Sequence, residues 1–188
     1  MNYVTRTAKQ KDIPSITAIY NQAIEDRTAA LETALTTEKE RSDWLHSRKA
    51  KFSVLIIESE NAEVLGWASL NEMNTKCCCS GVVDFSIYIK RELRGNGLGK
   101  ILLGSLIREA EKQGFSKLVL SALHSNQAAK RLYLSFGFRE VGVYEKHAFQ
   151  NGEWMDVVIM EKLLGDKLLG EKLLGEKLPT EKKPCGCV

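Results

Sequence analysis

Residues 82–110 read VVDFSIYIKRELRGNGLGKILLGSLIREA, and this stretch decides the fold class. Its first eight residues, Val82–Ile89, alternate and are rich in β-branched and aromatic side chains, which predicts a strand. Three glycines follow between positions 95 and 99, and apolar residues then recur at helical spacing from Ile101 to Ala110. Gly114 is a natural end for that helix. The sequence therefore predicts a strand, a glycine turn and a helix in close succession.

The turn itself is suited to an anion. It comprises Arg94, Gly95, Asn96, Gly97, Leu98, Gly99 and Lys100. Glycines permit a backbone whose amides point inward, and the start of a helix adds partial positive charge, so the turn favours a phosphate or pyrophosphate. It is not a Walker A loop, because Ile101 occupies the Ser/Thr position, and it does not satisfy G-x-G-x-x-G, because residue 100 is lysine. A turn that serves only as a connector is the alternative.

The sequence on either side of this stretch predicts more strands and helices. A first strand lies at Val4, and a helix begins at Asp12-Ile13-Pro14, where Asp12 is expected to accept hydrogen bonds from the first amides. Thr37 and Glu40 have capping-box spacing and predict a second helix. The remaining elements are strands at Phe52–Ile57, Val64–Leu70 and Lys117–Ala122, a helix at Gln127–Phe136, and strands at Phe138–Tyr144 and Trp154–Lys162. The predicted fold class is α/β, a mixed sheet with helices on both faces.

The composition excludes several classes of protein. With 188 residues, 44% of them hydrophobic and 27% charged, the chain matches one globular domain that folds without disulfides or metals. No apolar run approaches the roughly 18 residues of a membrane span, which predicts a cytoplasmic protein without a membrane partner. The net charge is +3, and residues 162–188 carry six lysines against four acidic residues, so the rest is almost neutral. A nucleic-acid partner is therefore not expected.

The cysteines fall in two groups. They are Cys77, Cys78 and Cys79 in a row, then Cys185 and Cys187 near the end. Reduced thiols are the favoured interpretation, because a metal site built from them would lack C-x-x-C spacing. We therefore expect no metal.

The end of the chain differs in kind from the rest. From Lys162 the sequence repeats every five residues, a period that fits neither a helix nor a strand, and its glycines disfavour a helix interior. We expect one domain over residues 1–164 and a mobile tail over residues 165–188. Docking of the tail to a partner or a membrane surface is the alternative.

Several ordered segments carry a family resemblance. Arg94-x-x-Gly97-x-Gly99 matches the R/Q-x-x-G-x-G/A signature of the GNAT acyltransferases. Over residues 1 to about 162 the chain resembles that superfamily, and it looks like the phosphinothricin and methionine sulfoximine N-acetyltransferase family. Further matching segments are Ile19-Tyr20-Asn21, Glu32, Gly66-Trp67-Ala68-Ser69, Val83–Ile89, Gly137–Gly142 and Trp154-Met155-Asp156. The resemblance implies the GNAT fold, with a mostly antiparallel central sheet, and acetyl transfer from acetyl-CoA to an amine.

The resemblance also implies how acetyl-CoA is held. The amides from Arg94 to Lys100 would cradle the pyrophosphate, and the pantetheine arm would pair like an added strand with the backbone of Ile87, Tyr88 and Ile89. An amide there would polarise the thioester carbonyl. Asn126 precedes a helix and is suited to cap it, and its contact with the pantetheine arm is implied by the resemblance.

Two residues are implied in the chemistry. An alkyl amine with a pKa of about 10 is mostly protonated at neutral pH and must lose a proton before it attacks. The resemblance gives this role to Asp84, directly or through water, and on an alternating strand Asp84 shares a face with Ser86 and Tyr88. A solvated strand carboxylate is the alternative. Tyr133 is the implied acid for the leaving thiolate, with a merely packed aromatic ring as the alternative.

The acceptor site is less sharply defined. Glu32 and Tyr20 match family segments and are expected to bind the substrate, and for Glu32 an exposed loop acid is the alternative. Family members that act on phosphinothricin-like amino acids carry arginines in the loop after G-Y/W-A-S, whereas the only cation of this loop is Lys76. We expect a primary amine on a small amino-acid-like molecule. A protein or peptide amine, or a noncatalytic CoA-binding module, are the alternatives, and a homodimer is left open.

Overall fold

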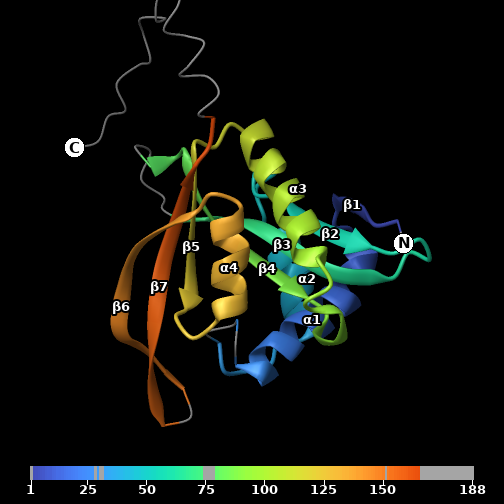
Figure 1. Ribbon diagram of the computed structural model, residues 1–188. Coiled ribbons are helices and arrows are strands. Elements are labelled where there is room, and N and C mark those ends of the chain that lie inside the picture. The colour runs from blue at the N-terminus through green and yellow to red at the C-terminus, as the bar shows by residue number, and fades with distance from the viewer. Residues whose placement is uncertain (1, 28, 30–31, 74–78, 151, 166–188) are drawn as a thin grey trace, which may run out of the picture.

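The computed structural model describes residues 2–27, 29, 32–73, 79–150 and 152–165. Within these residues a seven-stranded sheet forms the centre, in the order β1-β2-β3-β4-β5-β7-β6 (Figure 1). Its strands are β1 (Val4–Thr7), β2 (Val54–Glu58), β3 (Val64–Glu72), β4 (Val82–Ile89), β5 (Lys117–Leu123), β6 (Arg139–Gln150) and β7 (Glu153–Leu163). Neighbouring strands are antiparallel except for the parallel pair β4 and β5. The prediction of a mixed, mostly antiparallel sheet is confirmed.

Helices cover both faces of the sheet, as predicted. They are α1 (Ile13–Asp26) and α2 (Glu38–His46) on one face, and α3 (Leu98–Lys112) and α4 (Gln127–Ser135) on the other (Figure 1). Because side chains alternate along a strand, Ile56 packs with α1 while Leu55 and Ile57 join the cluster under α3. All three side chains are buried, which explains the continuous apolar run in β2.

The two predicted helix starts differ in outcome. Thr37 Oγ1 accepts a hydrogen bond from Glu40 N at 3.2 Å, and Glu40 Oε2 accepts one from Thr37 N at 2.7 Å, so the capping box is confirmed. The expected cap at Asp12 is wrong, because its side chain bonds no amide of α1. That carboxylate instead accepts from Arg6 Nη1 and from Lys9 N, both at 2.7 Å. A charged partner from β1 outcompetes the helix amides for it.

The pairing of β4 with β5 is short. Only Val82 to Asp84 pair with Lys117 to Val119, although β4 continues to Ile89 and β5 to Leu123. Beyond Asp84 the two strands diverge, and α4 lies over the gap (Figure 1). β4 keeps its other neighbour, since its pairing with β3 runs to Ile89. The side of β4 that faces β5 is therefore an open backbone edge.

The last strands are longer than predicted, since β6 and β7 extend to Gln150 and Leu163. The edge strand β6 carries exposed apolar side chains, among them Val141 and Tyr144. The packed body reaches Leu164, whose side chain is buried and whose amide donates to Ser116 O at 2.8 Å. Residues 166–188 lie outside the described residues, so the domain boundary and the mobile tail stay predictions.

Two other expectations touch undescribed parts of the chain. Cys77, Cys78, Cys185 and Cys187 lie outside the described residues, so the cysteine interpretation stays a prediction. Among the helices in the described ranges, none combines the length and the apolar character needed to cross a bilayer.

Candidate active site

A cavity of about 540 Å³ is bounded by the end of β4, the loop after it, the start of α3 and one face of α4. It lies where β4 and β5 diverge. The predicted site residues that line it are Ile87, Ile89, Arg94, Gly95, Gly97, Gly99, Lys100, Asn126 and Tyr133. The fold thus brings together the glycine loop, the open strand edge and the predicted acid.

The glycine loop has the backbone that an anion site needs. Gly95 and Gly97 have φ of +81° and +83°, in the left-handed region that favours glycine. A Cβ atom built on either residue would meet nothing within 4 Å, so their surroundings are open. Gly97 caps α3 without a side-chain hydrogen bond, and Lys100 N donates to Gly97 O at 3.0 Å, so among the described residues the open amides at the helix start are those of Leu98 and Gly99. These open amides at a helix start fit a pyrophosphate.

The side chain of Arg94 is tied to the surrounding framework. Its Nη1 pairs with Asp26 Oδ2 at 2.5 Å, and its Nε donates to Ile89 O at 3.1 Å. Arg91 pairs with the same carboxylate at 2.7 Å. The end of α1 therefore anchors the loop after β4. Lys100 and Arg131 also line the cavity and add positive charge suited to phosphates.

Asn126 and Tyr133 come from α4 and its cap. Asn126 Oδ1 accepts from Ala129 N at 3.0 Å, which confirms the predicted helix cap. The ring of Tyr133 is buried and packs edge-on against Phe85, with ring centroids 5.7 Å apart. Burial, and secondarily the charge of Asp84, raise the pKa of Tyr133 well above its ordinary value. Its hydroxyl therefore stays protonated at neutral pH.

Asp84 projects from β4 on the other face of the sheet. The predicted alternation holds, because Val83 and Phe85 belong to the core under α3, whereas Tyr88 packs with the cluster under α1. Burial raises the pKa of Asp84 to about 6, and hydrogen bonds from Asn71 and from the Phe85 backbone oppose that rise. Asn71 Nδ2 lies 3.4 Å from Asp84 Oδ2. The carboxylate is thus poised to exchange a proton near neutral pH.

The predicted acceptor residues lie on this same face. The Tyr20 ring packs against the rings of Tyr88 and Trp67, with centroids 5.1 and 5.9 Å away. The guanidinium carbon of Arg41 lies 3.8 Å from the Tyr20 ring centroid. Burial and the neighbouring carboxylate of Glu32 raise the pKa of Tyr20 to about 12. Glu32 and Tyr20 are therefore neighbours, and their part in acceptor binding stays a prediction.

Comparison with known proteins decides the family. Residues 16–138 match the model of the acetyltransferase (GNAT) family. The chain belongs to the GNAT family. It is 31% identical over 162 residues to the L-methionine sulfoximine/L-methionine sulfone acetyltransferase of Pseudomonas aeruginosa, covering 86% of this chain and 94% of that protein. It is therefore an enzyme, an N-acetyltransferase that uses acetyl-CoA.

Solved GNAT structures share the fold. A phosphinothricin acetyltransferase from Sinorhizobium meliloti in complex with acetyl-CoA has a TM-score of 0.84 and 26% identity, covering 88% of this chain and 90% of that one. A ribosomal-protein-alanine N-acetyltransferase from Brucella melitensis has a TM-score of 0.82 and 32% identity, covering 86% and 99%.

Some residues of this GNAT site differ from expectation. Tyr88, Asn96 and Leu98 do not line the cavity among its described residues, and Leu98 is buried in the core. Six lining residues were missed: Leu93, Ala128, Ala129, Arg131, Leu132 and Ser135. Five of them follow the Asn126 cap on one side of α4. Their three- and four-residue spacing is the signal that could have identified them.

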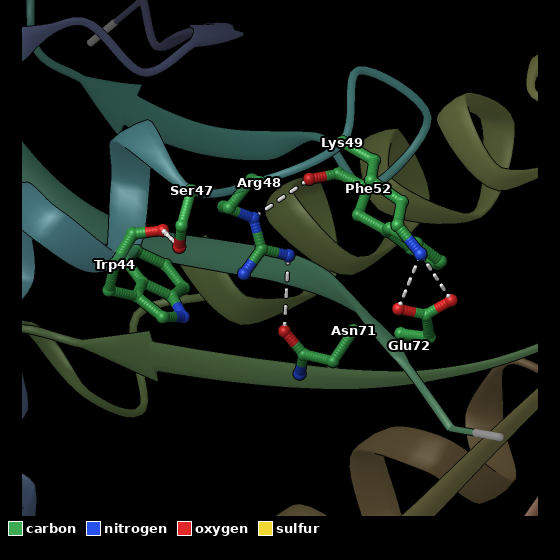
Figure 2. Close-up of a pocket in the computed structure, with 7 residues that line it drawn as sticks. All are labelled: Trp44, Ser47, Arg48, Lys49, Phe52, Asn71 and Glu72. Carbon is green, nitrogen blue, oxygen red and sulfur yellow. Dashed lines mark hydrogen bonds and ion pairs between the residues drawn. The ribbon is translucent and has the colours of Figure 1, made fainter. Parts of the chain in front are cut away.

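A second cavity of about 350 Å³ lies beside the end of α2 (Figure 2). Its lining includes Trp44, Arg48, Phe52 and Asn71. Sequence reasoning missed Arg48, and the cation expected nearby, Lys76, lies outside the described residues. Since Asn71 also contacts Asp84, this cavity is one side chain away from the predicted base.

Proposed function

We propose that this enzyme transfers the acetyl group of acetyl-CoA to the primary amine of a small, amino-acid-like acceptor, by direct attack of the amine on the thioester. The observation that carries the proposal is the position of Asp84. It is the last residue of β4 that pairs with β5, at the point where the cavity holding Tyr133 and the glycine loop begins. Asp84 as the base and Tyr133 as the acid thus lie on opposite faces of the sheet, on either side of the gap between β4 and β5.

The donor is held mainly by the main chain. The loop from Arg94 to Lys100, with the open amides of Leu98 and Gly99 at the start of α3, faces the pyrophosphate, and the open edge of β4 at Ile87–Ile89 pairs with the pantetheine arm. Acetyl-CoA supplies an activated acetyl group. The enzyme supplies the cradle, the edge amides that polarise the carbonyl, and the two proton-transfer groups.

Asp84 removes the proton that blocks the amine. With a pKa of about 6 it is ionised at neutral pH, yet it is a stronger base than an exposed aspartate. The freed amine attacks the carbonyl carbon and the new C–N bond forms. As the C–S bond breaks, the nitrogen loses a second proton, which balances the proton that the sulfur takes up. Overall, the acetyl group moves from sulfur to nitrogen and one proton is released.

Tyr133 serves the leaving sulfur. Its raised pKa keeps the hydroxyl protonated, so that it donates a hydrogen bond to the thiolate as negative charge develops there. An ordinary thiol has a pKa of about 8.5, below that of Tyr133, so Tyr133 passes its proton to sulfur only as it takes one from solvent.

The acceptor class draws support from a named relative. The Pseudomonas aeruginosa enzyme acts, by its name, on methionine sulfoximine and methionine sulfone, which are small amino acids. The Brucella melitensis structure is named for a protein amine and favours the second candidate, a protein or peptide acceptor. The homodimer and the cytoplasmic location stay predictions, and light scattering on the purified protein tests the first.

Thiol release from acetyl-CoA across a panel of amino acids, simple amines and peptides tests the proposal. Wild type should release thiol with a small amino-acid-like amine, and Asp84→Asn should reduce kcat by about 100-fold or more while CoA binding persists. Asp43→Asn, which changes an exposed carboxylate on α2, is the matched control.

The other possible results of the thiol-release experiment would each contradict part of the proposal. Thiol release that Asp84→Asn leaves unchanged would remove Asp84 as the base. Turnover with peptides alone would favour the protein acceptor. CoA binding without turnover on any amine would make the chain a binding module.

A further inference from the structure

We propose that Arg48 and the cavity beside α2 bind the carboxylate of the acceptor, and that the acceptor is therefore an α-amino acid with a free carboxylate. The inference rests on the proposed function, because it takes Asp84 as the base. Figure 2 shows the Arg48 guanidinium in this cavity of about 350 Å³, between the Trp44 ring and the Asn71 side chain.

The charge of Arg48 is not neutralised locally. Among the described residues no carboxylate forms an ion pair with it, whereas its neighbour Lys49 pairs with Glu72 at 2.8 Å. Burial lowers the pKa of Arg48 to about 10, and no carboxylate counteracts that shift. The Trp44 ring, whose centroid lies 4.5 Å from the guanidinium carbon, stacks against Arg48 but carries no negative charge. A mostly buried cation without a counter-ion favours an anionic ligand.

One nitrogen of the Arg48 guanidinium, Nη1, has hydrogen-bond donors that are not used within the described residues. Its Nε donates to Phe52 O at 2.9 Å, and its Nη2 donates to Leu70 O and to Asn71 Oδ1. Arginine has five N–H donors, so these bonds leave the two hydrogens of Nη1, which have no acceptor among the described residues. The bonds to the backbone hold the group in place. A carboxylate therefore meets an arginine that is already oriented.

The distance to the base suits an α-amino acid. One amide group and two hydrogen bonds, of 3.2 and 3.4 Å, separate Arg48 Nη2 from Asp84 Oδ2, so these atoms lie no more than about 9 Å apart; the free Nη1 is about 2.3 Å from Nη2 and therefore lies no more than about 11 Å from Oδ2. The carboxylate and amine of an α-amino acid are about 3 Å apart, and one hydrogen bond at each end extends the span to about 8–9 Å. An acceptor lying over Asn71 reaches both groups.

The same geometry discriminates between acceptors. A simple amine leaves Arg48 without its counter-ion, and a lysine side chain within a protein has no carboxylate next to its amine. A hydrogen bond to a buried charged group contributes about 10- to 100-fold in affinity. Arg48 thus selects free amino acids over both alternatives.

The first experiment needs no variant. Wild-type kinetics are compared for an accepted amino acid and for its α-carboxamide, which keeps the amine and the side chain but loses the negative charge. We expect the KM of the amide to be about 10- to 100-fold higher, after correction for the fraction of unprotonated amine, with a similar kcat. Equal KM values would overturn the inference.

A variant then assigns the effect to Arg48. Arg48→Gln should raise the KM of the amino acid towards that of the amide and leave the KM of the amide unchanged. Arg108→Gln, which removes an exposed arginine from α3 on the other face of the sheet, should keep the wild-type preference. An equal rise of both KM values in Arg48→Gln would indicate a purely structural arginine and overturn the inference.

A binding measurement separates this inference from the proposed function. The α-hydroxy acid analogue of the amino acid has the carboxylate but no amine to acetylate, and it should raise the melting temperature of wild type but not of Arg48→Gln. This shift together with no turnover on any amine would refute the proposed function but retain the carboxylate site. Turnover without the shift or the acid preference would refute only the carboxylate site.

Discussion

Asn71 donates its side-chain amide towards Asp84 Oδ2 at 3.4 Å, while its carbonyl oxygen accepts hydrogen bonds from Arg48 Nη2 and Ser69 Oγ at 3.2 and 2.9 Å. The two donors on the oxygen fix which end of the amide faces Asp84. Because a donor stabilises a carboxylate, Asn71 lowers the pKa that burial raises. Asn71→Leu should therefore raise the pKa of Asp84 further.

The pH dependence of kcat/KM measures this effect. For wild type the rate should rise through about pH 6, since Asp84 works in its ionised form. Asn71→Leu should move that rise upward by roughly 0.7 pH unit, the equivalent of one hydrogen bond of about 1 kcal/mol. Ser69→Ala keeps the donor to Asp84 and should shift the profile much less. An unshifted profile in Asn71→Leu would contradict this assignment.

Asp84→Asn should stabilise the protein while it inactivates the enzyme. The folded pKa of about 6 lies above the ordinary aspartate value of 3.8, so the ionised carboxylate costs stability. That cost is absent below pH 3.8, grows as the pH rises through the interval, and is complete above pH 6. Removing it should raise the free energy of unfolding by about 3 kcal/mol at pH 8.

Urea unfolding at two pH values tests this linkage. At pH 8 the midpoint of Asp84→Asn should exceed that of wild type, and at pH 4 most of the difference should vanish. If Asp84→Asn were less stable than wild type at pH 8, the ionised Asp84 carboxylate would not be lowering the free energy of unfolding.

Gly97→Glu should abolish coenzyme binding while the fold survives. The position is open, but a side chain there brings negative charge to the amides at the start of α3. We expect CoA affinity, measured by calorimetry, to fall by about 100-fold or more. Gly97→Ala carries the same strain at φ +83° without the charge and should lose much less. Equal losses in both variants would point to backbone strain alone.

Gly66→Ala should destabilise the sheet beside the site. A Cβ atom there would lie 2.6 Å from Ile89 Cδ1 and 2.8 Å from Tyr88 O, and the backbone oxygen cannot move cheaply. We expect a loss of about 1–3 kcal/mol in thermal or urea unfolding. At Gly142 an added Cβ meets nothing within 4 Å, so Gly142→Ala should be nearly neutral. Similar stabilities for Gly66→Ala and Gly142→Ala would mean that β3 and β4 move apart around the added methyl group without loss of stability.

The sequence predicts best where the signal is local. The bounds of β4, the Thr37 capping box and the Asn126 cap agree with the structure because each depends on neighbours within a few residues. The face shared by Asp84 and Tyr88 follows from the two-residue period of a strand.

What the sequence could not predict depends on distant partners. Arg48 bonds to Leu70 and Asn71, 22 and 23 residues away, so no spacing pattern reveals it. Asp12 follows the rule for a helix cap, yet Arg6 on the adjacent strand takes its carboxylate. In both cases a partner distant in the sequence, which tertiary packing brings close, decides what the side chain does.

The short pairing of β4 with β5 has a kinetic consequence. Acetyl-CoA and the acceptor amine can approach the gap between β4 and β5 beyond Asp84 from opposite faces of the sheet. Neither substrate then blocks the entry of the other. Both can reside on the protein at once, so double-reciprocal plots should intersect, and no acetylated side chain needs to form along the way.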